Sequence, residues 1–172
     1  MVTINKEMML RALASLDQKL NSPVRMIMGG GGAMVLAHGF PIGTYDIDAV
    51  PIQTNFADLD LAVKAVAREL SISPDWLNPY FSTFVHTLPS DYASRLIRVY
   101  EGKSLAVDAL GRQEMLIMKL FAGRQKDVAH AKLLIGSGVD LAKIEEHLEY
   151  LREKKIPGVD KAFDFLDDVS GE

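Results

Sequence analysis

Two features between residues 28 and 52 could together handle phosphate groups. Four consecutive glycines, Gly29–Gly32, are followed after a short apolar segment by Thr44, Asp46 and Asp48. Glycine leaves backbone amides open to a close approach by phosphate, because no Cβ stands in the way. In an extended segment, Asp46 and Asp48 point to the same side, about 6.6 Å apart along the chain. Carboxylates placed in this way are suitable ligands for Mg²⁺ or Mn²⁺.

The glycine run by itself leaves several interpretations open. It lacks the Gly-Lys-Ser/Thr of a Walker P-loop, because Ala33 and Met34 follow it, and no register supplies the third glycine of a dinucleotide-binding fingerprint. One remaining interpretation is a strand–turn–helix in which the amides of Gly30, Gly31 and Gly32 meet a triphosphate. The other is a tight turn where a helix packs against a sheet.

Three carboxylates are candidates for a metal site, and each also has a plainer interpretation. Asp46 and Asp48 share a strand with apolar residues, and a buried acid needs a partner cation, but both would also suit an exposed strand end. Asp108 lies in a third apolar strand. It would complete a triad, as metal ligand or proton acceptor, if that strand neighbours the first acidic one. Thr44 would bond a phosphate or cap its strand.

A lysine interrupts a helical segment that is otherwise apolar on all sides. Because Met115–Ala122 should be buried, the ammonium of Lys119 must either reach solvent or meet an anion. Arg124 and Asp127 follow, and Asp127 would orient one of the two cations or serve as a first-turn acid. Arg124 and His130 also have a spacing found in some helical ribonucleases, which provides a different functional hypothesis.

The elements that must position these residues alternate between helix and strand over the first two thirds of the chain. Periodicity and turn residues predict helices over 3–20, 33–38 and 55–70, and strands over 24–28, 46–52, 95–100 and 104–110. Residues 71–90 are less regular, and helices are expected over 113–122, 124–135, 140–154 and 159–167. This pattern predicts one α/β (α+β) domain over 1–172. Its mixed sheet, flanked by helices, occupies about 22–112, and a helical part occupies about 113–172.

The composition restricts the class of protein. The 172 residues include 48% hydrophobic residues and no cysteine, so disulfides, thiolate zinc sites and cysteine nucleophiles are excluded. The net charge of −4 provides no general attraction for nucleic acid. The N-terminus lacks the pattern of a signal peptide, and no apolar run approaches the roughly 18 residues that cross a bilayer. We therefore expect a cytoplasmic protein without a membrane partner.

Taken in order, the motifs resemble those of the DNA polymerase β-like nucleotidyltransferase superfamily. Gly30–Met34 and Thr44–Asp48 look like its G-G…D-x-D signature. Within the superfamily the chain more closely resembles bacterial nucleotidyltransferase-fold proteins that include abortive-infection toxins and many uncharacterised relatives, which carry K-L-x-A-x-R and a following K/R-D pair. Here these motifs are Lys119–Arg124 and Lys126–Asp127, and Asp75–Asn78 resembles a segment of one uncharacterised branch. The resemblance spans about residues 24–135.

This resemblance implies a nucleotidyltransferase fold and an activity. A nucleoside monophosphate would pass from an NTP, held with Mg²⁺ or Mn²⁺, to a hydroxyl of RNA, protein or a small molecule. A toxin role with an antitoxin partner is implied, and a non-catalytic nucleotide- or partner-binding module on the same fold is the alternative. The implied roles are metal ligation by Asp46 and Asp48, a triphosphate turn at Gly30 and Gly31, and a phosphate contact by Lys119 with Asp127 in support. The complete predicted nucleotide-binding set is Gly30, Gly31, Gly32, Thr44, Arg124 and Asp127.

Overall fold

The computed structural model describes residues 2–171, which form two compact units. The first unit contains the chain up to Ser82 together with Leu96–Leu110, and the second contains Thr83–Arg95 together with the chain from Gly111 onward. The predicted change from mixed core to helices at about residue 112 lies next to the boundary at Gly111. The sequence pattern did not indicate that residues 83–95 belong with the helices.

The first unit contains a mixed sheet, as predicted, and this sheet has five strands. Its strands are β1 (Val24–Gly29), β2 (Ile47–Ile52), β3 (Leu77–Asn78), β4 (Ile97–Glu101) and β5 (Leu105–Ala109), in the order β3-β2-β1-β5-β4. Strand β1 runs antiparallel to β2 and parallel to β5, and β4 and β5 form an antiparallel hairpin. The strand that carries Asp108, β5, therefore neighbours β1 and not β2, the strand that carries Asp48.

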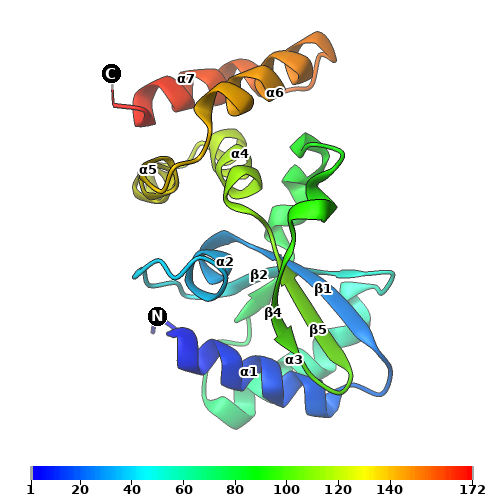
Figure 1. The fold of residues 1–172 in the computed structure, drawn as a ribbon. Helices are drawn as coiled ribbons and strands as arrows, with labels where there is room; N and C mark the ends of the chain where they lie inside the picture. Colours follow the sequence, from blue (N-terminus) through cyan, green and yellow to red (C-terminus); the bar gives the residue numbers. More distant parts are fainter. Residues whose placement is uncertain (1, 172) are drawn as a thin grey trace. The chain divides into compact units, whose positions relative to one another are not determined.

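Three helices accompany this sheet: α1 (Lys6–Lys19), α2 (Gly30–Leu36) and α3 (Asp60–Leu70), the last preceded by a 3₁₀ turn η1 (Phe56–Leu59). Helices α1 and α3 lie side by side (Figure 1). Helix α2 packs on β1 and β2, and a side chain at Gly32 would contact Met28 and Ile47. Gly32 thus permits close packing between helix and sheet.

The strands bury one face more completely than the other. Met26, Met28, Ile47, Ala49 and Val107 have no exposed surface, and they share what we name the helix face. Alternate residues point to the opposite side, and registered partners share a face. This opposite side, named the open face, carries the charged side chains of Arg25, Asp48, Arg98 and Asp108, together with half-buried Val50 and buried Ile27.

The structure corrects two predicted element bounds near the glycine run and adds one strand that was not predicted. Helix α2 begins at Gly30 and not at Ala33, so the run forms the first turn of the helix, and within the run only Gly30 has a positive φ, of 59°. Strand β2 begins at Ile47, which leaves Asp46 immediately before it. The two-residue strand β3 was not predicted, because it is too short to show an alternating pattern.

The second unit is helical, as predicted. It contains α4 (Arg112–Ala122), α5 (Val128–Gly136), α6 (Leu141–Glu153) and α7 (Val159–Val169), with 3₁₀ turns η3 (Tyr92–Arg95) and η4 (Gln125–Asp127); η2 (Tyr80–Thr87) crosses the boundary between the units. Helix α4 packs on α5 and α7, and α6 packs on α7. None of the helices within residues 2–171 has the length and apolar character needed to cross a bilayer.

Candidate nucleotide-binding site

The carboxylate of Asp48 lies directly against the glycine turn. Asp48 is paired with Gly29 across β1 and β2. A Cβ built on Gly30 would overlap Asp48 Oδ2, and it would lie 3.0 Å from Cγ and 3.2 Å from Cβ of the same aspartate. Gly30 also holds a φ of 59°, which residues with a side chain rarely adopt. The glycine is therefore required both by its backbone conformation and by the position of the acid.

Thr44 occupies the equivalent place against the next glycine. A Cβ on Gly31 would lie 2.9 Å from Thr44 Oγ1 and 3.0 Å from Thr44 Cβ. The Thr44 hydroxyl donates to the backbone oxygen of Asp46 at 3.0 Å, and its own carbonyl accepts from the amide of Ile4 at 2.8 Å. The threonine thus fixes the backbone immediately before β2, where Asp46 lies.

Asn78 holds Asp46, the other acid of the pair. Its Nδ2 donates to Asp46 Oδ2 at 2.6 Å, and its Oδ1 accepts from the amide of Tyr80 at 3.0 Å. The asparagine is placed by β3, where it is paired with Asp48. Its neighbour Trp76 is fully buried and donates its indole N–H to the carbonyl of Val63 in α3. A buried tryptophan therefore anchors the segment that orients Asp46.

The oxygen atoms of Asp46 and Asp48 fit a hard divalent cation. Both side chains are partly exposed, whereas Ile47, which lies between them in the sequence, is buried on the helix face. The contact between Asp48 and Gly30 leaves backbone, without a side chain, beside the acid. Within residues 2–171 no group of three or more histidine, cysteine, aspartate or glutamate residues could hold a metal ion. Mg²⁺ commonly takes one or two carboxylates and completes its shell with water and substrate phosphates. The pair therefore fits an ion that arrives with its substrate.

The structure does not bring Asp108 to this pair. Its carboxylate accepts from Arg25 Nε at 2.8 Å and from Arg98 Nε at 2.6 Å. Burial alone would raise the pKa of Asp108, but the hydrogen bonds and charges of the two arginines bring it below its usual value. A carboxylate with a lowered pKa is a weak proton acceptor. The predicted triad required the strand of Asp108 to lie next to the strand of Asp48. In the structure β1 lies between them, so this condition is not met.

A second predicted group lies within the helical unit. Lys119 is 7% exposed and donates to Asp127 Oδ1 at 2.7 Å, so the anion that this buried lysine requires is an aspartate of the same unit. Arg124 donates to the other oxygen, Oδ2, at 2.6 Å. Burial raises the pKa of Asp127, but Arg124 and Lys119 outweigh that effect and lower it. Asp127 therefore orients both cations, whereas the sequence predicted that it would orient one of them or serve as a first-turn acid.

His130 borders this group and adds an unsatisfied atom. Its Nδ1 is buried without a hydrogen-bond partner among the described residues. Burial lowers the pKa of His130, and the nearby positive charge of Lys119 lowers it further. Both effects favour the neutral form of the imidazole. The guanidinium of Arg124 is bonded to both carboxylate oxygens of Asp127.

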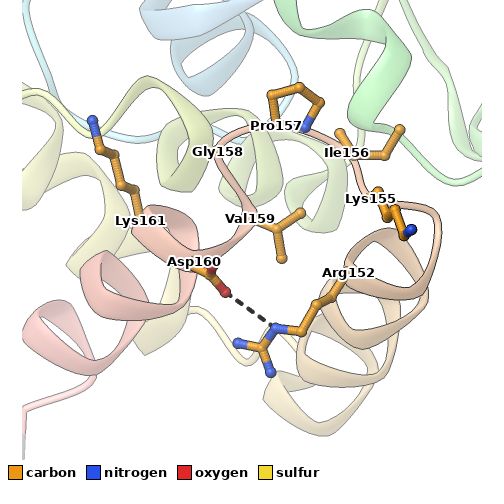
Figure 2. A pocket seen from close by; sticks show the side chains of 8 residues that line it. All are labelled: Arg152, Lys155, Ile156, Pro157, Gly158, Val159, Asp160 and Lys161. Atoms are coloured by element: carbon orange, nitrogen blue, oxygen red, sulfur yellow. Dashed lines mark hydrogen bonds and ion pairs between the residues drawn. The ribbon is translucent and has the colours of Figure 1, made fainter.

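A hollow of about 430 Å³ lies elsewhere in the helical unit, around the turn between α6 and α7 (Figure 2). Arg152 lines this hollow, and its guanidinium donates to Asp160 at 3.2 Å and to Glu149 at 3.0 Å. The same guanidinium lies 4.1 Å from the ring centroid of Phe163. None of the residues predicted to form the site lines this hollow, so it is not part of the candidate site.

The sequence profile of one protein family covers most of the chain. The profile, described as a nucleotidyltransferase of unknown function (DUF6036), matches residues 5–155. The chain belongs to this family. Among curated proteins and among solved structures no match was found. Membership of a nucleotidyltransferase family confirms the coarser part of the resemblance, and the likeness to abortive-infection toxins stays a prediction.

In this nucleotidyltransferase-family chain the predicted residues fall into two groups. The sheet unit brings together the glycine turn, Thr44, Asp46 and Asp48. The helical unit brings together Lys119, Arg124 and Asp127. Asp108 belongs to the sheet unit but has its own arginine partners.

Three further residues of this family member escaped the sequence analysis. Asn78 was quoted only as part of a resembling segment, although an asparagine directly after a buried Trp-Leu pair is a plausible partner for an acid. Arg25 and Arg98 each interrupt an apolar strand, as Asp108 does. Two arginines and one aspartate, each within a short apolar strand, could have indicated that the three side chains form ion pairs across a sheet.

Proposed function

We propose that this chain is a divalent-cation-dependent nucleotidyltransferase that moves a nucleoside monophosphate from an NTP to a hydroxyl. The observation that carries the proposal is the contact between Asp48 and Gly30. This contact places a carboxylate, a suitable ligand for a divalent cation, beside a glycine turn whose amides can bind a triphosphate. Family membership supports the reaction class.

Asp46 and Asp48 would hold Mg²⁺ or Mn²⁺, which when bound neutralises charge on the transferred phosphoryl group. Asn78 keeps Asp46 in place through its 2.6 Å hydrogen bond. Gly30 and Gly31 let Asp48 and Thr44 lie directly against the backbone of the turn, and Gly32 keeps the turn close to the sheet. The backbone amides of this turn would meet phosphate oxygens. The resemblance implies a phosphate contact by Lys119 with Asp127 in support, and within the helical unit Asp127 accepts from both Lys119 and Arg124.

In the reaction, the acceptor oxygen bonds to the α-phosphorus as the bond to the β-phosphate oxygen breaks, which releases pyrophosphate. The hydroxyl proton passes to one carboxylate of the Asp46 and Asp48 pair. Asp108 is less suited to accept this proton, because two arginines lower its pKa. The aspartate pair thus serves in positioning and in proton transfer.

The resemblance to abortive-infection toxins extends the proposal to a toxin that a protein antitoxin neutralises. Support for this extension comes from the order of the sequence motifs. Expression of the wild-type chain should then arrest bacterial growth, and expression of Asp48→Asn should not. Equal growth of both cultures would argue against the toxin role without bearing on the chemistry.

The decisive experiment incubates pure protein with each α-labelled NTP, Mg²⁺ and an extract of RNA and protein. Label should enter one acceptor class in the wild type and not in Asp48→Asn. Asp58→Asn is the matched control, because Asp58 is an exposed acid in η1. Nucleotide binding without label transfer or pyrophosphate release would favour the non-catalytic module. RNA cleavage that needs no NTP and survives Asp46→Ala would favour a ribonuclease.

A further inference from the structure

A second charged group lies on the open face, beside the candidate site. The side chain of Asp108 is 5% exposed, whereas those of Arg25 and Arg98 are 54% and 40% exposed. Asp108 Oδ2 accepts from Arg25, and Asp108 Oδ1 accepts from Arg98 at 2.6 Å. One buried carboxylate therefore holds two guanidinium groups, each of which presents its remaining surface to solvent.

The strand register fixes the distance between this group and the acid pair. Asp48 is paired with Gly29, and Arg25 lies four residues earlier on β1, which corresponds to about 13 Å along the strand. Arg98 lies on β4, where it is paired with Asp108 of β5. Strand β4 is three strand positions from β2, which corresponds to about 14 Å across the sheet. A cation on the acid pair contacts phosphate oxygens at about 2 Å. The arginines would therefore meet a different phosphate group.

Guanidinium groups fixed in this way are suited to phosphodiesters. Arginine presents paired N–H donors that match two phosphate oxygens, and orientation by a buried acid reduces the entropy lost on binding. Glu101 also contacts Arg98, at 3.1 Å, but its side chain is 71% exposed. Such a surface pair is weak, so a phosphate can replace it.

We propose that Arg25 and Arg98 bind the backbone phosphate of a single-stranded polynucleotide, with Asp108 as their positioning residue. That this strand is the acceptor rests on the proposed nucleotidyltransferase function. A ligand that reaches both groups must carry phosphates over about 13 Å, which a nucleotide chain does and a single phosphorylated metabolite does not. The net charge of −4 implies that binding depends on these few contacts.

Binding of a short fluorescent single-stranded RNA, measured by anisotropy without NTP or Mg²⁺, tests the proposal. Each phosphate contact on a single strand contributes about 0.7 to the slope of log affinity against log salt. Arg25→Gln and Arg98→Gln should each lower that slope by about 0.7. Arg11→Gln and Arg68→Gln are matched controls, because these exposed arginines lie on α1 and α3. They should leave the slope unchanged.

Two variants protect the test against loss of folding. Glu101→Gln removes the exposed competitor and should tighten RNA binding about two- to five-fold, which no folding defect can imitate. Arg98→Lys retains the charge and should retain most of the salt slope. Equal RNA affinity and equal slope in wild type, Arg25→Gln and Glu101→Gln would overturn the proposal. Equal competition by AMP and by unlabelled RNA would also overturn the polynucleotide assignment.

Asp108→Asn separates a positioning role from a catalytic one. With RNA as acceptor, the variant should raise the KM for RNA and largely retain kcat, whereas loss of a metal ligand or base would lower kcat at any RNA concentration. Asp48→Asn should lose pyrophosphate release and keep RNA binding. If wild type releases no pyrophosphate but Arg25→Gln weakens RNA binding, the proposed transferase activity fails and the RNA site stands.

Discussion

Replacement of Gly30 by alanine tests the contact on which the candidate site depends. Two effects should destabilise Gly30→Ala. The first is backbone strain, because a φ of 59° costs a residue with a Cβ about 1–2 kcal/mol. The second is the overlap with Asp48. Rotation of the carboxylate cannot remove it completely, since Asp48 Cβ itself lies 3.2 Å from the new atom. Overpacking of this kind costs about 1–3 kcal/mol, so the total is about 2–5 kcal/mol.

Gly39→Ala provides the matched control for the first effect. Gly39 has a φ of 66°, and a Cβ there would meet nothing within 4 Å. Urea unfolding should therefore show a loss of about 1–2 kcal/mol in Gly39→Ala and a larger loss in Gly30→Ala. In an Asp48→Ala background the excess at Gly30 should shrink, which a double-mutant cycle measures as a coupling of about 0.5–3 kcal/mol.

Activity provides an independent measurement of the same contact. The displaced carboxylate of Asp48 in Gly30→Ala should reduce pyrophosphate release about 100-fold, since a misplacement of about 1 Å has that effect. Gly39→Ala should retain wild-type turnover. The reasoning is refuted if Gly30→Ala and Gly39→Ala lose equal stability in both backgrounds, or if Gly30→Ala turns over at the wild-type rate.

Three further predictions follow from the contacts of the two groups. Asn78→Ala removes the hydrogen bond to Asp46 and should weaken Mn²⁺ binding about 10- to 100-fold by calorimetric titration, so unchanged affinity would exclude the supporting role of Asn78. Lys119→Met leaves buried Asp127 with Arg124 alone and should cost about 3 kcal/mol in urea unfolding, whereas a cost below about 1 kcal/mol would contradict the importance of the pair. The pKa of His130 is lowered in the folded state, chiefly by burial, so stability should fall as the pH drops from about 6.5 towards that folded value, because only the unfolded chain takes up the proton. His130→Gln should remove this slope, and an unchanged pH profile in the variant would show that His130 is not its source.

Local sequence patterns were sufficient for most of the elements. Helices α4, α6 and α7 have apolar periodicity and clear ends at Gly123, Asp140 and Gly158, so their bounds differed from prediction by a residue or two. The glycine run was less predictable. Three glycines after Gly29 favour a loop by propensity, but packing of Gly32 on Met28 and Ile47 draws them into the helix.

Partners that are distant in sequence could not be predicted in the same way. Asn78 reaches Asp46 because Trp76 is anchored on α3 and β3 adds to the edge of β2. Asp108 meets Arg25 because β5 lies beside β1. Strand order depends on how whole strands and helices pack, and no local periodicity encodes it.

The sequence by itself determined which chemistry is available: two acids with alternate spacing, glycines that leave amides accessible, and a lysine in an apolar helix that must find an anion. These follow from side-chain type and from short-range geometry, which hold in almost any fold. Only the tertiary structure decided which acids share a site, because the order β3-β2-β1-β5-β4 places β1 between Asp48 and Asp108. A difference of one strand position gave Asp108 two arginines as partners and left Asp46 and Asp48 as a pair.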